Sequence, residues 1–600
     1  MVAGSGAAGL TAALTAAVHG ARVTLVERAA ELGGTTALSF GRVWLPAFGD
    51  IQAREYLTAV YGDRYPHMVS AFLTAAPEMA CFVQRHSAIR FTPCESYPDY
   101  HPSLPGASPG GRAQDIVPVT SATLAGQVRR PPGYLPLTHA DWERWRYPRR
   151  YDQDELAGRL RRGTVAGGVA LAATLLDGAI RVGVRVLTKT RLTAVRLGPS
   201  GEVVTAELDR DSDPLTIPAN AVIMATGGFD RNPELRKRLL PGPVADATGA
   251  VPTNTGDALR IAEELGAALD NTGQAWWMPM LAVPDEEPYY RSLIRERALP
   301  RQIIVNRAGH RFADEALPYN EFVKAMLAQP GNATAWMIFD EGYRSDFPVP
   351  GADSRATMPG WAKQSGSLAE LAEAIGAPGE TLARTTGRWN ANCAAGTDPD
   401  FGRGSNAYER YMGDPGTRPN PNLGPIDRPP YYAIQVLPGT IGTKGGPVTD
   451  TSSRVLTPSG QPITGLYAAG NAAAFWTGGG YPGPGATLGI AMTMAYLAAR
   501  HAAGSVKVLF FLRPSPFSDL SVSGARILRS TSPAGSPARD REGETHEWQV
   551  AQADDDGGGL RRADGLQLQV QWRRGRGQRR LTHSRSSRIA LAWVRGWLAG

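Results

Sequence analysis

The 600-residue sequence has few residues of the kinds that mark disulfide frameworks, metal sites or membrane spans. Its three cysteines, Cys81, Cys94 and Cys393, form an odd set without metal-ligand spacing, which is typical of a reducing compartment. No secretory signal is apparent, because residue 1 leads directly into a glycine-rich strand–helix pattern. No uninterrupted apolar run is long enough to form a membrane-spanning helix. We therefore predict a soluble, cytoplasmic protein without a metal site.

An excess of charge of one sign is also missing from most of the chain. Residues 1–504 carry 47 basic and 47 acidic side chains, whereas residues 505–600 carry 16 and 9. The net charge of +7 therefore belongs to the end of the chain, and it does not predict nucleic-acid binding. Because 505–600 are rich in Ser, Pro, Gly and Arg, we expect a disordered or non-native tail there.

The beginning of the chain contains a dinucleotide-binding pattern. Gly4, Gly6 and Gly9 have G-x-G-x-x-G spacing, which permits a tight turn, close approach to a pyrophosphate and close helix packing. A small-residue helix is expected next, and its N-terminus would face the phosphates. The expected strand 21–26 ends at Glu27, where an acid is placed to hydrogen-bond a ribose. The pattern predicts dinucleotide binding.

The next segments favour FAD over NAD and define the expected fold. Gly33-Gly-Thr-Thr36 directly after the acid supplies backbone amides and hydroxyls for a flavin site. We predict an α/β fold, with a Rossmann-like FAD-binding domain formed by 1–271 and 428–504. Its parallel sheet is expected to carry an inserted β-meander, and 272–427 are expected to form an inserted α+β substrate domain.

Several motifs carry a resemblance to a known family. They are Gly33–Thr36 with Trp44–Pro46, Gln274–Trp277, Glu315–Tyr319, Gly442–Gly446 and Tyr481–Gly485. With these motifs, residues 1 to about 503 resemble the FAD flavoproteins of the fumarate reductase and succinate dehydrogenase type. Within that group the sequence is most similar to the 3-ketosteroid Δ1-dehydrogenases, which are oxidoreductases of steroid metabolism and lipid degradation.

The resemblance implies a reaction and the residues that perform it. Tyr481 and the backbone N–H of Gly485 would hold the 3-keto oxygen, as in an oxyanion hole. Tyr319 would remove a proton from C2 with help from Tyr100, while a hydride leaves C1 for flavin N5. Because a phenol has a pKa near 10, we expect the pKa of Tyr319 to be depressed by its neighbours, or activity to be best at alkaline pH.

The same resemblance implies non-covalent FAD, a 3-ketosteroid substrate and an external electron acceptor. The residues expected to hold FAD are Gly4, Ser5, Gly6, Ala8, Gly9, Glu27, Gly33, Gly34, Thr35, Thr36, Ser39, Ala225, Gly227, Gly470, Asn471, Thr487 and Leu488.

Some positions depart from the family pattern or have two interpretations. The family usually has a glycine-rich run between Thr36 and Trp44, and here Phe40 and Arg42 interrupt it. A large side chain near the flavin would narrow the pocket or alter substrate choice. Trp276 and its neighbour Trp277 either line an apolar steroid pocket or pack in the core.

Three alternative functions remain open from the sequence. A fumarate reductase-like enzyme would use basic residues for which His310 and Arg311 are candidates. A Δ4-ketosteroid oxidoreductase would differ only in pocket shape. An inactive FAD-binding remnant is suggested by the short segment before Gly4 and by the unusual tail.

Overall fold

The computed structural model describes residues 1–120, 126–242, 244, 246–283, 290–349 and 358–504, with three short segments further along the chain. Met1–Val506 form one compact unit, and Lys507–Gly600 form a second. In the second unit, β23 (Ala525–Ile527), β24 (Val550–Gln552) and β25 (Arg561–Arg562) make an antiparallel sheet. The rest of the predicted disordered tail lies outside the described residues. The division of the first unit into domains stays a prediction.

A six-stranded sheet with the order β21-β22-β12-β1-β2-β8 forms the nucleotide-binding half of the first unit. Its parallel strands are β1 (Val2–Ala3), β2 (Thr24–Val26), β8 (Arg185–Leu187), β12 (Val222–Met224) and β22 (Pro462–Ala468), and β21 (Arg454–Leu456) is antiparallel at one edge. Although β1 has only two residues, both are buried and pair with β12 and β2. The short first strand is therefore central to the sheet.

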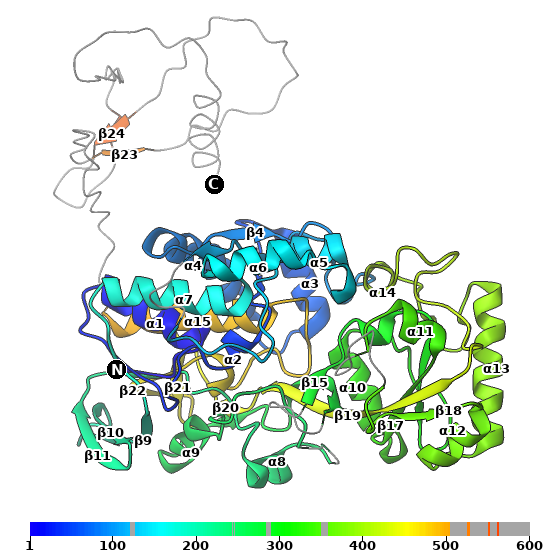
Figure 1. Ribbon diagram of the computed structural model, residues 1–600. Helices are drawn as coiled ribbons and strands as arrows, with labels where there is room; N and C mark the ends of the chain where they lie inside the picture. The colour runs from blue at the N-terminus through cyan, green and yellow to red at the C-terminus, as the bar shows by residue number, and fades with distance from the viewer. Residues whose placement is uncertain are drawn as a thin grey trace, which may run out of the picture. The chain divides into compact units, whose positions relative to one another are not determined.

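Helices made largely of small residues cover this sheet. They are α1 (Ala7–Val18), α7 (Gly167–Arg181) and α15 (Ala486–Ala502), and α1 packs against both of the others. Figure 1 shows the three helices lying together beside the parallel strands. Ala and Gly side chains allow such close helix packing, so the helices bury almost all of their surfaces. The core of this half lies between these helices and the sheet.

The predicted β-meander is confirmed. The strands β9 (Thr190–Leu197), β10 (Val203–Arg210) and β11 (Asp213–Pro218) pair in sequence as an antiparallel sheet. Their apolar residues alternate with polar ones, as expected for a sheet with one buried face.

A second sheet carries the other half of the site. Its order is β15-β14-β19-β17-β16, with β18 paired to β19. The strands are β14 (Ala275–Ala282), β15 (Tyr290–Ser292), β16 (Gln302–Asn306), β17 (Ala335–Asp340), β18 (Lys363–Ser365) and β19 (Tyr431–Thr443). Helix α10 (Tyr319–Leu327) packs on β14. Helices α12 (Leu368–Ile375) and α13 (Gly379–Ala395) pack on each other, and α12 contacts β19.

The region 91–150, which is rich in Pro, Gly, Tyr and Arg, contains several short regular elements. Strand β5 (Ala113–Ile116) pairs with both β3 (Val43–Trp44) and β4 (Phe91–Pro93), and α5 spans His139–Trp145. Thr138 and Asp141 cap α5 reciprocally, which is a recognisable helix-start signal. The loop between β4 and β5 holds Tyr97 and Tyr100.

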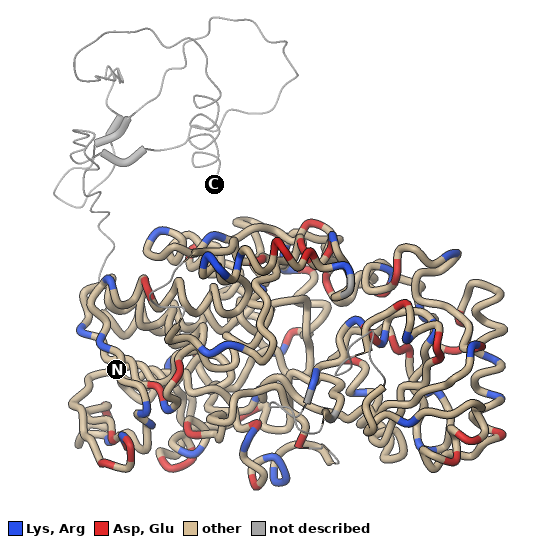
Figure 2. Tube along the Cα trace, in the orientation of Figure 1, with Lys and Arg blue, Asp and Glu red and all other residues tan. Residues whose placement is uncertain are grey.

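The remaining elements complete the first unit. They are α2 (Gly34–Leu38), α3 (Ile51–Tyr61), α4 (Pro66–His86), β6 (Val119–Thr120), α6 (Gln153–Arg161), β7 (Thr164–Val165), α8 (Pro233–Leu239), α9 (Asp257–Glu264), β13 (Leu269–Asp270), α11 (Glu341–Asp346), α14 (Ala407–Met412) and β20 (Gly446–Pro447). Figure 2 shows basic and acidic residues interspersed along this part of the chain. In the described residues, no helix is long and apolar enough to cross a membrane, and no cluster of acidic, His and Cys side chains is arranged to hold a metal ion.

Candidate active site

A cavity of about 1060 Å³ brings the predicted cofactor residues and the predicted catalytic residues together. The predicted residues that line it are Gly4, Ser5, Gly6, Ala8, Glu27, Gly34, Thr35, Thr36, Ser39, Tyr100, Ala225, Gly227, Tyr319, Gly470, Asn471, Tyr481, Gly485, Thr487 and Leu488. Gly9 and Gly33 instead allow close packing behind this lining, Gly9 against the backbone of Gly4 and Gly33 against the side chain of Ala37. Ala3 of β1 and Met278 of β14 also line the cavity, so both six-stranded sheets of the first unit contribute to it.

Two of the three glycines of the first turn, Gly4 and Gly9, are required by close approaches. Gly4 has a φ of +102°, and a Cβ there would lie 2.2 Å from the carbonyl oxygen of Ala225. A Cβ on Gly9 would lie 1.8 Å from the carbonyl oxygen of Gly4. At Gly6, in contrast, the nearest atom is the Thr36 hydroxyl at 3.5 Å. Gly6 thus leaves space above the N-terminus of α1, where a pyrophosphate would bind.

Glu27 is fixed at the end of β2. Its carboxylate accepts hydrogen bonds from the Ser5 backbone N–H (2.9 Å), the Ser5 hydroxyl (2.6 Å) and the Ala29 N–H (2.8 Å). The Ser5 hydroxyl also accepts a hydrogen bond from Gly33 N–H at 2.9 Å. The strand end, the glycine turn and α2 are therefore joined around a buried acid that lines the cavity.

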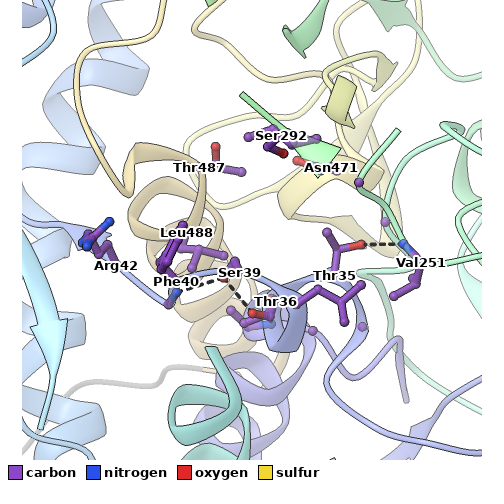
Figure 3. A pocket seen from close by; sticks show the side chains of 18 of the residues that line it. Thr35, Thr36, Ser39, Phe40, Arg42, Val251, Ser292, Asn471, Thr487 and Leu488 are labelled. Atoms are coloured by element: carbon purple, nitrogen blue, oxygen red, sulfur yellow. Dashed lines mark hydrogen bonds between the residues drawn. The ribbon is translucent and has the colours of Figure 1, made fainter. Parts of the chain in front are cut away.

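Hydroxyl groups continue this lining. The Thr35 hydroxyl accepts a hydrogen bond from Val251 N–H at 3.2 Å, and the Thr36 hydroxyl accepts one from Ala7 N–H at 3.0 Å (Figure 3). Thr226 also lines the cavity, and its buried hydroxyl has no hydrogen-bond partner among the described residues. An open glycine cradle, a fixed acid and a hydroxyl without a partner fit an extended dinucleotide such as FAD.

Three tyrosines from distant parts of the chain meet at the other end of the cavity. The Tyr100 hydroxyl donates a hydrogen bond to the Tyr319 hydroxyl at 2.9 Å. The Tyr481 ring lies edge-on to both, with ring centroids 5.2 Å from Tyr100 and 5.4 Å from Tyr319. The Thr487 hydroxyl donates to the Tyr481 hydroxyl at 3.2 Å, leaving the Tyr481 proton available to another acceptor.

Burial raises the pKa of all three phenols. The pKa of Tyr319 lies well above 10, first because of burial and then because Tyr481 is close. Burial likewise raises the pKa of Tyr100 well above 10 and raises that of Tyr481. The expectation that neighbours depress the pKa of Tyr319 is therefore wrong for this site without substrate, because desolvation of the phenolate dominates.

The sequence around Tyr319 folds onto a buried ion network. Tyr319 is the first residue of α10, directly after the N-cap Pro318. Glu315 is fully buried and pairs with Arg311 (2.7 Å) and Arg403 (3.1 Å). The network fixes the segment that leads into α10, and it places Arg311 in a structural role. Arg311 also pairs with Asp398 at 2.8 Å, so it does not fit the proton donor of a fumarate reductase-like enzyme.

The loop before Tyr481 is held by two residues that the sequence did not single out. The Lys444 side-chain nitrogen donates hydrogen bonds to the carbonyl oxygens of Gly478 (2.8 Å) and Gly480 (2.7 Å), while burial lowers the pKa of this group well below its usual value. Asn320, which follows Tyr319, donates to the carbonyl oxygen of Gly479 at 3.1 Å. Because Asn320 and Lys444 bind successive carbonyls, they set the position of Tyr481 relative to Tyr319. Lys444 lies within the Gly442–Gly446 motif, but the motif itself does not indicate this contact.

Trp276 and Trp277 lie behind the site, and their packing decides between the two interpretations given for them above. Trp276 and Trp277 are fully buried, and the Trp276 ring packs on Tyr481 with centroids 4.5 Å apart. Lys444 also packs on Trp276, with its side-chain nitrogen 3.7 Å from the ring centroid. Core packing is therefore the correct interpretation for both tryptophans. Tyr408 was not predicted, although its ring contacts that of Tyr100 at 5.2 Å.

Comparisons with known proteins agree with this geometry. The FAD binding domain family matches residues 1–488. The chain belongs to this family. FAD is its cofactor, and the residues described above fit that role.

Individual proteins similar to this chain extend the comparison. The chain is 39% identical to a 4-oxocyclohexanecarboxylate 2-dehydrogenase of Sinomonas cyclohexanicum, over 84% of this chain and 92% of that protein. It is 38% identical to a 3-oxosteroid 1-dehydrogenase of Mycobacterium tuberculosis, over 84% and 98%. A crystal structure of 3-ketosteroid Δ1-dehydrogenase from Sterolibacterium denitrificans, in complex with 1,4-androstadiene-3,17-dione, matches with a TM-score of 0.80 at 34% identity, covering 84% of this chain and 99% of that one.

Proposed function

We propose that this chain is an FAD-dependent 3-oxosteroid 1-dehydrogenase that introduces a 1,2 double bond into the A ring of a 3-ketosteroid. The observation that carries the proposal is the contact of Tyr100, Tyr319 and Tyr481 in the cavity that also holds the cofactor residues. The curated 3-oxosteroid 1-dehydrogenases support it, because they match over most of both chains.

The keto oxygen is polarised at the N-terminus of α15. Tyr481 donates its hydroxyl proton, since its own acceptor position is occupied by the Thr487 hydroxyl. Gly485 is the N-cap of α15, where backbone N–H groups lack intrahelical partners and the helix dipole is positive. Two donors aimed at one oxygen stabilise the enolate charge that develops as the C2 proton leaves. The substrate ketone thus becomes acidic at C2.

Tyr319 takes the C2 proton. Its phenolate is unfavourable in the buried site, so the hydrogen bond from Tyr100 must stabilise the negative charge as the proton moves. Held by the residues described above, FAD would supply the two-electron acceptor for the hydrogen that leaves C1 with its bonding pair. An external electron acceptor is then required for each further turnover, and its identity does not follow from these residues.

The proposal is tested by anaerobic reduction of the purified holoenzyme. Androst-4-ene-3,17-dione is added without any other acceptor, and the visible band of oxidised flavin is followed. We expect the band to bleach as one equivalent of the 1,4-diene forms. An unchanged spectrum with intact bound FAD would contradict steroid dehydrogenation and would favour an inactive remnant or another substrate class.

A further inference from the structure

The cavity continues from the catalytic tyrosines along strand β14. Trp276, which packs on Tyr481, shares one face of this strand with Met278 and Met280, because side chains alternate between the two faces. Met278 lines the cavity, and so does Ser292, which is paired with Met280 in the neighbouring strand β15. Four residues of strand span about 13 Å, so this wall carries the cavity well beyond the tyrosines.

Helix α14 leads from the tyrosines toward the same end of the cavity. Tyr408, near its start, packs edge-on to Tyr100 with ring centroids 5.2 Å apart. Met412, at its end, lines the cavity, and its carbonyl oxygen accepts a hydrogen bond from Arg295 Nε at 3.0 Å. The rise between these two helix residues is about 6 Å. Arg295 and its neighbour Glu296 therefore lie about one helix turn and one aromatic ring beyond Tyr100.

The carboxyl group of Glu296 lines this end of the cavity. Its Oε2 accepts a hydrogen bond from Ile294 N–H at 3.0 Å, whereas Oε1 accepts none from the described residues. The side chain is half-buried, so it keeps accessible surface where it lines the cavity. Burial raises the pKa of the carboxyl. One oxygen of Glu296 is therefore left for a group that enters the cavity.

No basic side chain neutralises Glu296 directly. The three side-chain nitrogens of Arg295 all donate to main-chain carbonyl oxygens, at 2.8–3.3 Å, and two nitrogens of Arg297 do the same. Within the part of the chain that the structure describes, no ion pair within 4.0 Å involves Glu296. Tyr151 also lines the cavity, and burial and then the closeness of Glu296 raise its pKa. The free oxygen of Glu296 thus has no donor from the protein.

A hydroxyl group is the ligand group that best suits this carboxyl. A hydroxyl donates to the ionised form and both donates to and accepts from the protonated form, whereas a ketone pairs only with the protonated form. Such a donor also compensates the cost of holding the carboxyl away from bulk water. A ligand that carries a hydroxyl here is therefore favoured in either protonation state of Glu296.

The distance from the tyrosines matches the length of a steroid. Four fused rings built from C–C bonds of about 1.5 Å are about 10 Å long, comparable with the extent of the two walls. We propose that Glu296 binds a hydroxyl group on the D ring of the 3-ketosteroid, at the end remote from the reacting ring. This inference rests on the proposed function, because it takes the keto group to be held by Tyr481 and Gly485.

The experiment compares two steroids that differ only in the oxidation state of C17. Steady-state kcat/KM of the holoenzyme is measured with 17β-hydroxyandrost-4-en-3-one and with androst-4-ene-3,17-dione. We expect the hydroxysteroid to exceed the ketone by about tenfold, as hydrogen bonds to charged groups allow. In Glu296→Leu, which removes the acceptor, the ratio should fall to about one. Glu296→Gln, which keeps a neutral acceptor, should give an intermediate ratio.

The matched control is Glu380→Leu, because Glu380 is an exposed glutamate of α13, and it should keep the wild-type ratio. Binding of the two corresponding 1,4-diene products to the oxidised holoenzyme, measured by calorimetry, reports the subsite without turnover. Flavin content and thermal melting identify a variant that fails to fold.

The outcomes separate this inference from the proposed function. Tighter binding of the hydroxylated diene than of the 17-ketone, lost in Glu296→Leu, supports the inference even if no steroid is oxidised. Equal binding of the two dienes by the wild-type enzyme, or a kcat/KM ratio unchanged in Glu296→Leu, overturns it even if both steroids are oxidised. Failure to oxidise either steroid, with the binding preference intact, overturns only the proposed function, and failure to bind either diene overturns both.

Discussion

At the scale of single residues, the site depends on hydroxyl groups placed within hydrogen-bonding reach of one another. Tyr100 donates to Tyr319, and Thr487 donates to Tyr481, so each of these two phenol oxygens accepts a hydrogen bond and keeps its own proton to donate. The pattern around each tyrosine could be predicted from the sequence. Their pKa values could not, because burial by the whole fold sets them.

Replacing either catalytic phenol should separate chemistry from cofactor binding. Tyr481→Phe removes a donor to the keto oxygen, and Tyr319→Phe removes the base, so each should lower kcat by about 10²–10³-fold. Flavin content should be unchanged, because neither hydroxyl bonds to the predicted FAD residues of the glycine turn. Near-wild-type turnover in either variant would show that its assigned role is wrong. Tyr65→Phe, remote from the cavity lining, is the control.

The raised pKa of Tyr319 predicts the direction of the pH dependence. A base must be deprotonated to act, and the pKa of this phenol lies well above 10 in the free enzyme. The phenolate fraction therefore rises with pH throughout the neutral and mildly alkaline range, and kcat/KM should rise with it. A kcat/KM profile that is level from neutral pH upward would contradict Tyr319 as the base. Tyr100→Phe should move the rise to still higher pH.

At the scale of elements, helix ends and tight loops position the reactive groups. Helix α10 begins at Tyr319, and α15 is capped by Gly485. The N-terminal ends of both helices therefore carry proposed catalytic groups that line the cavity, and the two helices pack on different sheets. The helices and the meander could be predicted from periodicity and turn residues. The capped helix α5 was missed, although Thr138 and Asp141 are a local signal for it.

Gly485 should tolerate no side chain. Its φ of +91° is strained for any other residue, and a Cβ would lie 2.5 Å from the carbonyl oxygen of Arg42. Gly485→Ala should displace the α15 N-terminus and lower kcat/KM by at least about tenfold, a loss measured by steady-state kinetics. Gly201→Ala is the control, because Gly201 has a φ of +81° with no atom within 4 Å. Equal effects of both changes would refute a close-approach role.

We expect Lys444 to affect catalysis by fixing the position of Tyr481. Lys444→Met leaves the carbonyls of Gly478 and Gly480 without their donor, and unsatisfied buried groups cost about 1–3 kcal/mol each. We expect a lower melting temperature and a fall in kcat that exceeds the change in KM. Lys324→Met is the control, because Lys324 is partly exposed and pairs with Glu321. Unchanged kcat in Lys444→Met would show that the loop needs no such support.

At the scale of the whole molecule, both six-stranded sheets contribute residues to one cavity within the first compact unit. Both the cofactor residues and the tyrosines belong to Met1–Val506. The net positive charge, in contrast, comes from residues beyond 504. Activity should therefore depend on the first unit alone.

Ending the chain after Val506 tests this separation. The shortened enzyme should bind FAD and oxidise substrate as the full-length chain does, because every hydrogen bond described at the site lies within the first unit. Flavin content, melting temperature and kcat/KM are compared side by side with the full chain. Loss of FAD or of folding on truncation would show that the residues after Val506 belong to the catalytic body.

The sequence by itself determined the local chemistry of this protein. The Gly4–Gly9 turn and the acid at Glu27 follow from spacing, because turns and strand ends depend on neighbouring residues, and the resemblance to a known family pointed to the tyrosines. Only the tertiary structure decided which groups meet. Tyr100 and Tyr319 are 219 residues apart, and long-range packing alone brings them together, buries them and raises their pKa values. The same packing places Arg42 beside Gly485, which no local pattern specifies.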